Sequence, residues 1–172
     1  MAEQKAATDR KMAGMEASRD QELMGRIIQM MQTDSLGQIM EDPEVDRAFR
    51  PLFERHLSMI DSIRQAAKLE EGVVYFDLSS LDAEGYSKFI PYYLFPECVY
   101  SVGLSLSSSR SKVSVGFNPW SPEPRRHNLA SICERYNGGG HAVVCAISYR
   151  PDQIDLARVT AQSIAGELRS RV

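Results

Sequence analysis

Apolar side chains recur at helical spacing through the first third of the chain. Between residues 19 and 32 the apolar positions follow a period close to 3.6, which is typical of an amphipathic helix. Ser35 then offers a fresh N-cap, and Asp42-Pro43-Glu44 combines a cap, a proline at the first helical position and an acid in the first turn. We therefore expect residues 1–70 to form a helical arm, or a set of inter-domain linker helices.

The pattern changes at Glu71-Gly72, where strand-like segments begin. Residues 73–78 form an apolar run that indicates a buried strand, and the alternating segments 99–106 and 112–117 indicate a hairpin. A helix is predicted from Asn128, an apolar central strand over 142–147, and a last helix from Pro151. Residues 71–172 should thus form a small mixed β-sheet domain with flanking helices, in the α/β (α+β) class.

Composition and charge limit the partners and the cellular compartment that we expect for this chain. The chain has 172 residues and a net charge of −3, so any contact with nucleic acid must come from a local patch. No apolar run approaches the roughly 18 residues that span a bilayer, and the N-terminus lacks a signal-peptide pattern. We therefore expect a cytoplasmic protein with no membrane partner. Its cysteines, Cys98, Cys133 and Cys145, have no metal-site spacing and are expected to be reduced and buried.

Three consecutive glycines, Gly138, Gly139 and Gly140, stand between a predicted helix and the most apolar strand, with His141 at the junction. A helix C-cap and a tight turn need only one or two glycines. The third leaves two interpretations open, a purely structural turn and an anion-binding nest of backbone N–H groups. Because a helix C-terminus carries the negative end of the dipole, an anion site here also needs cationic side chains.

The segment from 118 to 127 supplies such cations. Its three prolines within six residues exclude regular structure, and it ends in Arg125, Arg126 and His127. For the arginine pair, a solvated loop end and a phosphate contact are both open. Trp120 is the only tryptophan, and it either covers the core, which we favour, or offers a stacking platform for a base.

All eight methionines fall in the N-terminal part of the chain. Two interpretations are equally open: these flexible side chains fill the core of the protein itself, or they form a surface that packs against another chain. The carboxylates of this part alternate with lysine and arginine, as on solvated helix faces.

The segment from Lys112 to Ile147 resembles the C-terminal DHH-associated domain of the DHH phosphoesterase superfamily. It runs through a strand (KVSVGF), a loop (NPWSPEPRRHN), a helix (NLASICERY), the motif NGGGH and an apolar strand. The resemblance extends over about residues 72–170, and the loop is most similar to the exopolyphosphatase-related branch. Asn137 stands where the family usually has another glycine, and Val115, Gly116 and Phe117 follow Ser114 where the family often has an arginine.

In this superfamily the GGGH loop contacts the nucleotide or phosphate end of the substrate. A separate N-terminal domain holds two manganese ions on Asp and His ligands and performs the hydrolysis. The resemblance therefore implies a substrate-recognition module, related to the exopolyphosphatase and oligoribonuclease-like enzymes, that binds a short nucleotide or phosphoester. The implied contacts are Gly138, Gly139, Gly140 and His141, assisted by Asn118, Arg125, Arg126 and His127.

The sequence carries no DHH triplet and no other metal-binding motif of that catalytic domain. We therefore expect no hydrolysis by this chain alone, no catalytic or metal-ligating residue and no cofactor in it, with manganese confined to a separate catalytic domain. Two other functions stay open. The Met-rich arm would pair with a partner chain or form a homodimer, or the module would be an RNA-binding appendage, against which the net charge of −3 argues.

Overall fold

In the computed structural model of the chain, residues 21–82 and 86–170 are described; the helix expected over the first twenty residues lies outside them. The chain divides into two compact units, residues 1–55 and 56–172.

The described part of the first unit, residues 21–55, consists mainly of helices, as its periodicity predicts. Residues 21–30 are helical, and they are followed by α2 (Leu36–Glu41) and the first turns of α3 (Pro43–Ala66). Ser35 and Gln38 form a capping box on α2. Asp42 accepts the backbone N–H groups of Glu44 and Val45 at 3.0 and 3.2 Å and so caps α3, which continues through Pro51.

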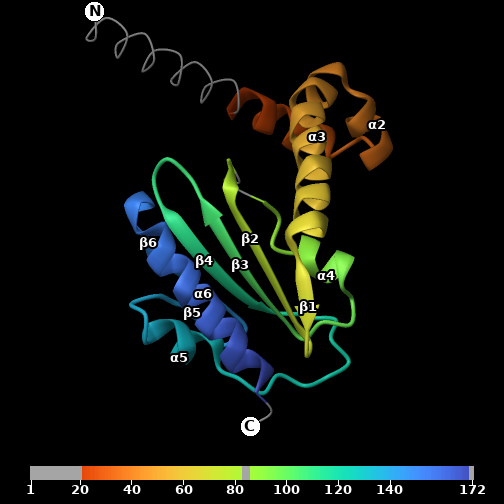
Figure 1. Ribbon diagram of the computed structural model, residues 1–172. Coiled ribbons are helices and arrows are strands. Elements are labelled where there is room, and N and C mark those ends of the chain that lie inside the picture. The colour runs from red at the N-terminus through yellow and green to blue at the C-terminus, as the bar shows by residue number, and fades with distance from the viewer. Residues whose placement is uncertain (1–20, 83–85, 171–172) are drawn as a thin grey trace, which may run out of the picture. The chain divides into compact units, whose positions relative to one another are not determined.

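The second unit is a six-stranded mixed sheet in the order β1-β2-β3-β4-β6-β5 (Figure 1). Only the β2–β3 pair is parallel among these six strands. The α/β class and the flanking helices expected from the sequence are confirmed. The strands are β1 (Lys68–Glu70), β2 (Val73–Asp82), β3 (Tyr100–Leu106), β4 (Ser111–Phe117), β5 (Gly139–His141) and β6 (Val144–Tyr149).

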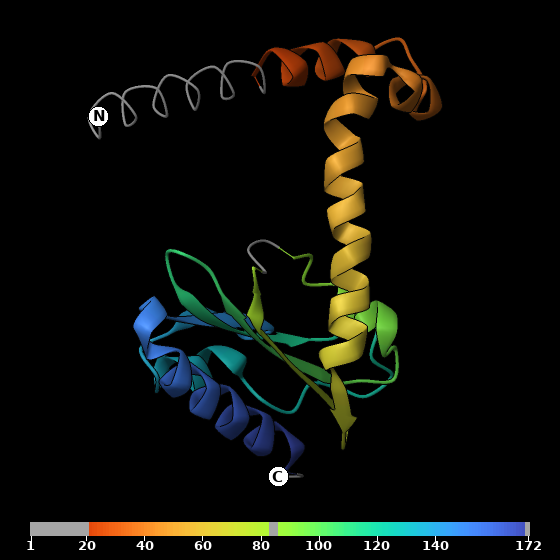
Figure 2. The same cartoon turned by 45° about the horizontal axis from the view of Figure 1, so that its top comes forward.

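Helices cover both faces of this sheet (Figure 2). On one face lie α5 (Leu129–Glu134) and α6 (Ile154–Arg169), the latter entered through a 3-10 turn, η1 (Pro151–Gln153). Their core contains Val102, Val113, Leu129 and Ile164, all fully buried. On the other face the last turns of α3 and α4 (Ile90–Leu94) pack over β2. That second core contains Ile63, Val74, Phe76, Leu78 and Ile90.

Three sequence expectations for this unit are wrong. Residues 68–70 form β1 and not the end of a helix, and residues 139–141 form the edge strand β5 and not a loop. Ala142 and Val143 make the turn into β6, which lies second from the edge and not at the centre of the sheet. Both missed strands are three residues long, so neither carries enough alternation to be detected.

Two of the three cysteines also depart from expectation. Cys133 of α5 and Cys145 of β6 form a disulfide, with their Cα atoms 6.4 Å apart. Cys98 alone is a free, buried thiol, and burial raises its pKa to about 12. The disulfide fastens α5 to the strand that pairs with β5.

Candidate functional site

The glycine segment begins with a helix cap centred on Asn137. Asn137 has φ +57°, its N–H donates to Glu134 O at 3.1 Å, and the Gly138 N–H donates to Cys133 O at 2.9 Å. These two bonds make a Schellman cap, in which the left-handed residue is commonly glycine and sometimes asparagine. Asn137 therefore supplies the left-handed backbone conformation that this cap requires.

The three glycines answer to different constraints. A Cβ on Gly138 would lie 2.5 Å from Ile147 Cγ1 and 2.6 Å from Ala146 O. Gly140 has φ +150°, and a Cβ there would lie 2.6 Å from Cys145 Cα. At Gly139 nothing beyond its two chain neighbours lies within 4 Å of the position that a Cβ would take, and its φ is not positive. Folding thus requires Gly138 and Gly140, whereas Gly139 leaves a patch of bare backbone on the surface.

Strand pairing places Gly139 and His141 on a sheet face made of short side chains. Residues that are directly opposite each other on neighbouring strands have side chains on the same face of the sheet. Following the pairs from strand to strand therefore gives a row of side chains that crosses the sheet on one face. This face is the one opposite α5 and α6. Its two rows are Phe76, Gly103, Ser114, Ala146, Gly139 and Val74, Ser101, Gly116, Val144, His141.

We call the outer part of these rows the small-residue face: Ser114, Gly116, Gly139, His141, Val144 and Ala146. Gly139 and His141 are exposed, and Ser114, Val144 and Ala146 are half-buried. The inner part of the rows, on β2, carries the bulky residues that pack under α3 and α4. The small-residue face therefore presents the Gly139 backbone and the His141 imidazole, with the half-buried side chains of Ser114, Val144 and Ala146 between them.

Aromatic residues near α4 border the small-residue face. A small cavity of about 40 Å³ is lined by Tyr86, Lys88 and Tyr92 together with Ser114, Gly116 and Val144. A Cβ on Gly116 would collide with the Tyr92 hydroxyl, which accepts a hydrogen bond from Ser101 Oγ at 2.9 Å. Burial raises the pKa of both tyrosines to about 12, so their hydroxyls stay protonated.

Asn118 lies inside the protein. Its side chain is fully buried, and Nδ2 donates to Pro96 O at 3.2 Å and to Cys98 O at 2.8 Å. Its Oδ1 accepts the backbone N–H of Trp120 at 3.0 Å. The side chain therefore anchors the loop and presents no free group at the surface.

Trp120 itself is 68% exposed, so the expectation that it covers the core is wrong. Its ring meets the ring of Phe89 edge to face, with centroids 5.7 Å apart.

The cationic end of the 118–127 loop lies beside α6. The backbone N–H groups of Arg126 and His127 donate to the Tyr100 hydroxyl at 2.8 and 3.1 Å, and Arg126 pairs with Glu123 at 2.9 Å. Arg125 Nη1 donates to His127 O at 2.6 Å. A cleft of about 590 Å³ is lined by Arg126 and His127 and also by Glu71, Glu97, Glu123 and Arg169, so its charge is mixed.

Backbone hydrogen bonds connect that loop to the glycine segment at two points. Phe117 N donates to Val143 O at 2.9 Å, and Leu129 N donates to Ala142 O at 3.1 Å. The turn that follows His141 is thus held by the residues just before and just after the loop. The structure fixes the two segments to each other, but it directs Arg126 and His127 to the mixed-charge cleft and Gly139 and His141 to the small-residue face.

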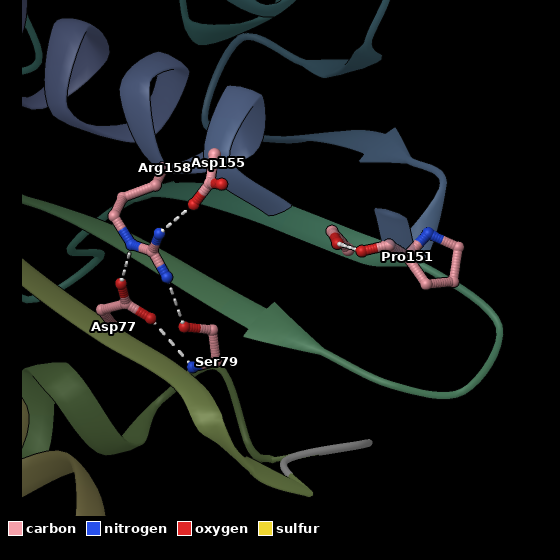
Figure 3. A network of polar contacts seen from close by, with 6 residues as sticks. Asp77, Ser79, Pro151, Asp155 and Arg158 are labelled. Atoms are coloured by element: carbon pink, nitrogen blue, oxygen red, sulfur yellow. Dashed lines mark hydrogen bonds and ion pairs between the residues drawn. The ribbon is translucent and has the colours of Figure 1, made fainter. Parts of the chain in front are cut away.

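A polar network that the sequence does not reveal fastens α6 to β2 (Figure 3). Arg158 Nε pairs with Asp77 at 2.8 Å, Nη2 donates to Ser79 Oγ at 3.0 Å, and Nη1 pairs with Asp155 at 2.6 Å. Burial raises the pKa of Asp77, but the hydrogen bonds from Ser79 and Arg158 outweigh it and leave the pKa below its usual value. Asp77 and Arg158 are 81 positions apart in the sequence, so no local sequence pattern indicates this contact.

Across residues 21–82 and 86–170, no group of three or more His, Cys, Asp or Glu side chains is arranged to hold a metal ion. In the same part of the chain, no helix is both long and apolar enough to cross a membrane.

Comparison with known proteins shows a likeness at the level of the fold. No family model matches the sequence, and no curated protein matches it. Among solved structures, the fold is similar to that of a pGpG-specific phosphodiesterase from Vibrio cholerae, with a TM-score of 0.70 and 20% sequence identity. The match covers 86% of this chain and 51% of that one, so the chain spans about half the length of the phosphodiesterase. The chain therefore shares its fold with part of a phosphodiesterase.

Proposed function

We propose that the second unit is a recognition module for a phosphoester ligand of the nucleotide type, and that the small-residue face is its binding surface. The observation that carries the proposal is the row pattern, which ends in bare backbone at Gly139 and an imidazole at His141. The nucleotide class is supported by the fold shared with a pGpG-specific phosphodiesterase. The proposed contacts are the Gly139 backbone, the Ser114 hydroxyl and the His141 ring.

The chemistry of this face suits binding. A hydroxyl and an imidazole donate hydrogen bonds to phosphate oxygens without a fixed full charge, and the absence of a side chain at Gly139 lets a ligand approach the backbone closely. Lys88, at the border of the face, adds one ammonium group. Arg125, Arg126 and His127 stay predicted auxiliary contacts, which a ligand would reach only beyond the turn at Ala142 and Val143. Hydrolysis would need the Asp/His manganese domain, which we assign to a separate polypeptide region.

Calorimetric titration of the full chain with a 5′-phosphorylated dinucleotide and with pyrophosphate tests the binding surface. His141→Ala and Ser114→Ala should each weaken binding of both ligands about 5- to 20-fold, as expected for loss of one hydrogen bond to a charged group. Ser148→Ala, at an exposed position of the neighbouring row, is the matched control and should bind like the parent. Equal affinities for all four proteins would refute the assignment of the face.

The catalytic part of the proposal has its own assay. The chain is incubated with manganese and with short oligonucleotides or bis-phosphate esters, and product release is followed. We expect no turnover. Robust hydrolysis that His141→Ala abolishes would show that the chain is an enzyme by itself.

A partner-binding role of the first unit is the second candidate, and it has an observation of its own. Among residues 21–55, which are the described part of that unit, large apolar side chains are exposed: Met24, Ile28, Met31, Leu36, Met40, Phe49, Leu52 and Phe53. Exposed apolar surface of this kind is typical of protein interfaces. Light scattering of the chain, compared with the double variant Phe49→Ser/Phe53→Ser, tests it. A parent that stays monomeric at high micromolar concentration would exclude self-association.

A further inference from the structure

Three exposed aromatic rings stand next to the proposed phosphate surface. Phe89, Tyr93 and Trp120 expose 46%, 74% and 68% of their surfaces. The Lys88 ammonium lies 5.2 Å from the centroid of the Phe89 ring, and Trp120 meets that ring at an interplanar angle of 66°. We call Lys88, Phe89, Tyr93 and Trp120 the aromatic platform. Lys88 and Trp120 already contact the Phe89 ring. The exposed indole of Trp120 is therefore the surface on which another flat group can stack.

The platform is held in place by buried contacts. Asn118 is fully buried, and its Oδ1 fixes the Trp120 backbone while its Nδ2 bonds to the carbonyls of Pro96 and Cys98. Tyr93 N donates to Phe89 O at 3.0 Å, so these two rings stand one helical turn apart. A ring fixed before binding loses little conformational entropy when a ligand stacks on it. Asn118 is therefore a positioning residue for Trp120.

Lys88 joins the platform to the small-residue face. The same lysine that lies over Phe89 lines the small cavity with Ser114 and Gly116. A ligand whose phosphate lies near Lys88 and Ser114 thus finds an exposed aromatic surface next to that phosphate. Phosphate and base stand in this relation in a nucleotide, and aromatic rings bind single-stranded nucleic acid by stacking on successive bases.

We infer that the aromatic platform binds a nucleobase by stacking on Trp120, so that the ligand of this module is a short single-stranded nucleic acid and not a base-free phosphate ester. This inference rests on the proposed function, because the small-residue face supplies the phosphate contact. A protein partner that inserts an apolar side chain is the competing occupant. The ammonium over the Phe89 ring favours the anionic nucleotide over such a side chain.

Fluorescence reports on the platform directly, because Trp120 is the only tryptophan of the chain. The full chain is titrated with a 5′-phosphorylated dinucleotide, and with ribose 5-phosphate and pyrophosphate as base-free probes. The dinucleotide should quench the emission saturably, and the base-free probes should bind without quenching. In calorimetry Trp120→Ala should lose about 10- to 100-fold in dinucleotide affinity and none in pyrophosphate affinity. Trp120→Phe should retain most of the dinucleotide affinity.

The matched control is Leu156→Ala, another truncation of an exposed apolar side chain, on the α6 side of the sheet; it should change neither affinity. Unchanged dinucleotide affinity in Trp120→Ala, with pyrophosphate still bound, would overturn the platform and leave the phosphate surface intact. Failure of every phosphate compound to bind would overturn the proposed function and the platform together. An emission that shifts with protein concentration alone, and not with ligand, would assign the platform to a protein contact and refute stacking.

Discussion

Substitution of the three glycines one at a time should separate folding from binding. Gly139→Val adds a β-branched side chain to an edge strand at a position with open space around the new Cβ. Valine fits strands better than glycine by up to about 1 kcal/mol, so the free energy of unfolding should rise by roughly 0.5–1 kcal/mol. The same side chain would cover the bare backbone of the proposed binding surface. The variant should therefore be more stable than the parent and bind phosphoesters at least about 10-fold more weakly.

The two flanking glycines should behave in the opposite way. A Cβ at Gly138 would meet Ile147 Cγ1 at 2.5 Å and Ala146 O at 2.6 Å. Overpacking of this kind costs about 1–3 kcal/mol, so Gly138→Ala should lose that amount of stability. At Gly140→Ala the same overpacking is joined by about 1–2 kcal/mol for a side chain at φ +150°, so this variant should lose roughly 2–5 kcal/mol.

Urea unfolding followed by far-UV circular dichroism measures these stabilities, and calorimetry with a dinucleotide measures binding. Gly166→Ala is the matched control, since Gly166 lies exposed in α6 with open space around its Cβ. It should gain about 0.5–1 kcal/mol from helix propensity and bind normally. A Gly139→Val protein that binds like the parent would refute the assignment of bare backbone to the ligand. Loss of more than about 1 kcal/mol in that variant would refute the steric argument.

The remaining predictions concern the contacts that hold the second unit together. Asp77→Asn should lower the free energy of unfolding by about 1–2 kcal/mol in urea titrations, whereas Asp155→Asn, on the same arginine but 91% exposed, should stay within about 0.5 kcal/mol. The pKa of Asp77 in the folded protein lies below its unfolded value near 4. The contribution of this carboxylate to the free energy of unfolding is therefore complete above about pH 4 and is lost as the pH falls through the folded pKa. The unfolding free energies of the parent and of Asp77→Asn should thus converge in acid. Reduction of the Cys133–Cys145 disulfide by a dithiol should cost about 2–3 kcal/mol, judged from a loop of 12 residues, and Cys133→Ala should make stability insensitive to the dithiol. Three reactive thiols in the unfolded, unreduced protein would contradict the disulfide.

Sequence pattern sufficed for the long elements and failed where tertiary contacts decide. The period of 3.6 before residue 66 and the alternation in β3 and β4 are local signals, and the structure confirms both. The strand β5 contradicts propensity, since glycine disfavours strands; its pairing with β6 overrides that preference. Asn118 shows a second limit, because its position in a proline-rich loop gives no sign of a fully buried amide.

For the candidate site, too, some features follow from local sequence and others depend on tertiary contacts. The GGGH motif predicts Gly139 and His141 as contacts, and that stays a prediction. The row that places them on one face with Ser114 depends on strand register, which no single segment specifies. The disulfide was missed because twelve residues separate cysteines in a helix and a strand, with nothing local to indicate their pairing.

The row of short side chains from Gly103 to Gly139 has a consequence for how the unit acquires the proposed binding surface. The row crosses β3, β4, β6 and β5, and β4 meets β6 only after the chain has closed a long loop with several prolines. Such non-local pairing forms late in folding compared with hairpins. Neither the β3–β4 hairpin nor the β5–β6 hairpin presents the complete row, so neither hairpin alone carries the complete proposed binding surface. Ligand would then stabilise only the fully assembled sheet, and its saturation would measure the native fraction of a preparation.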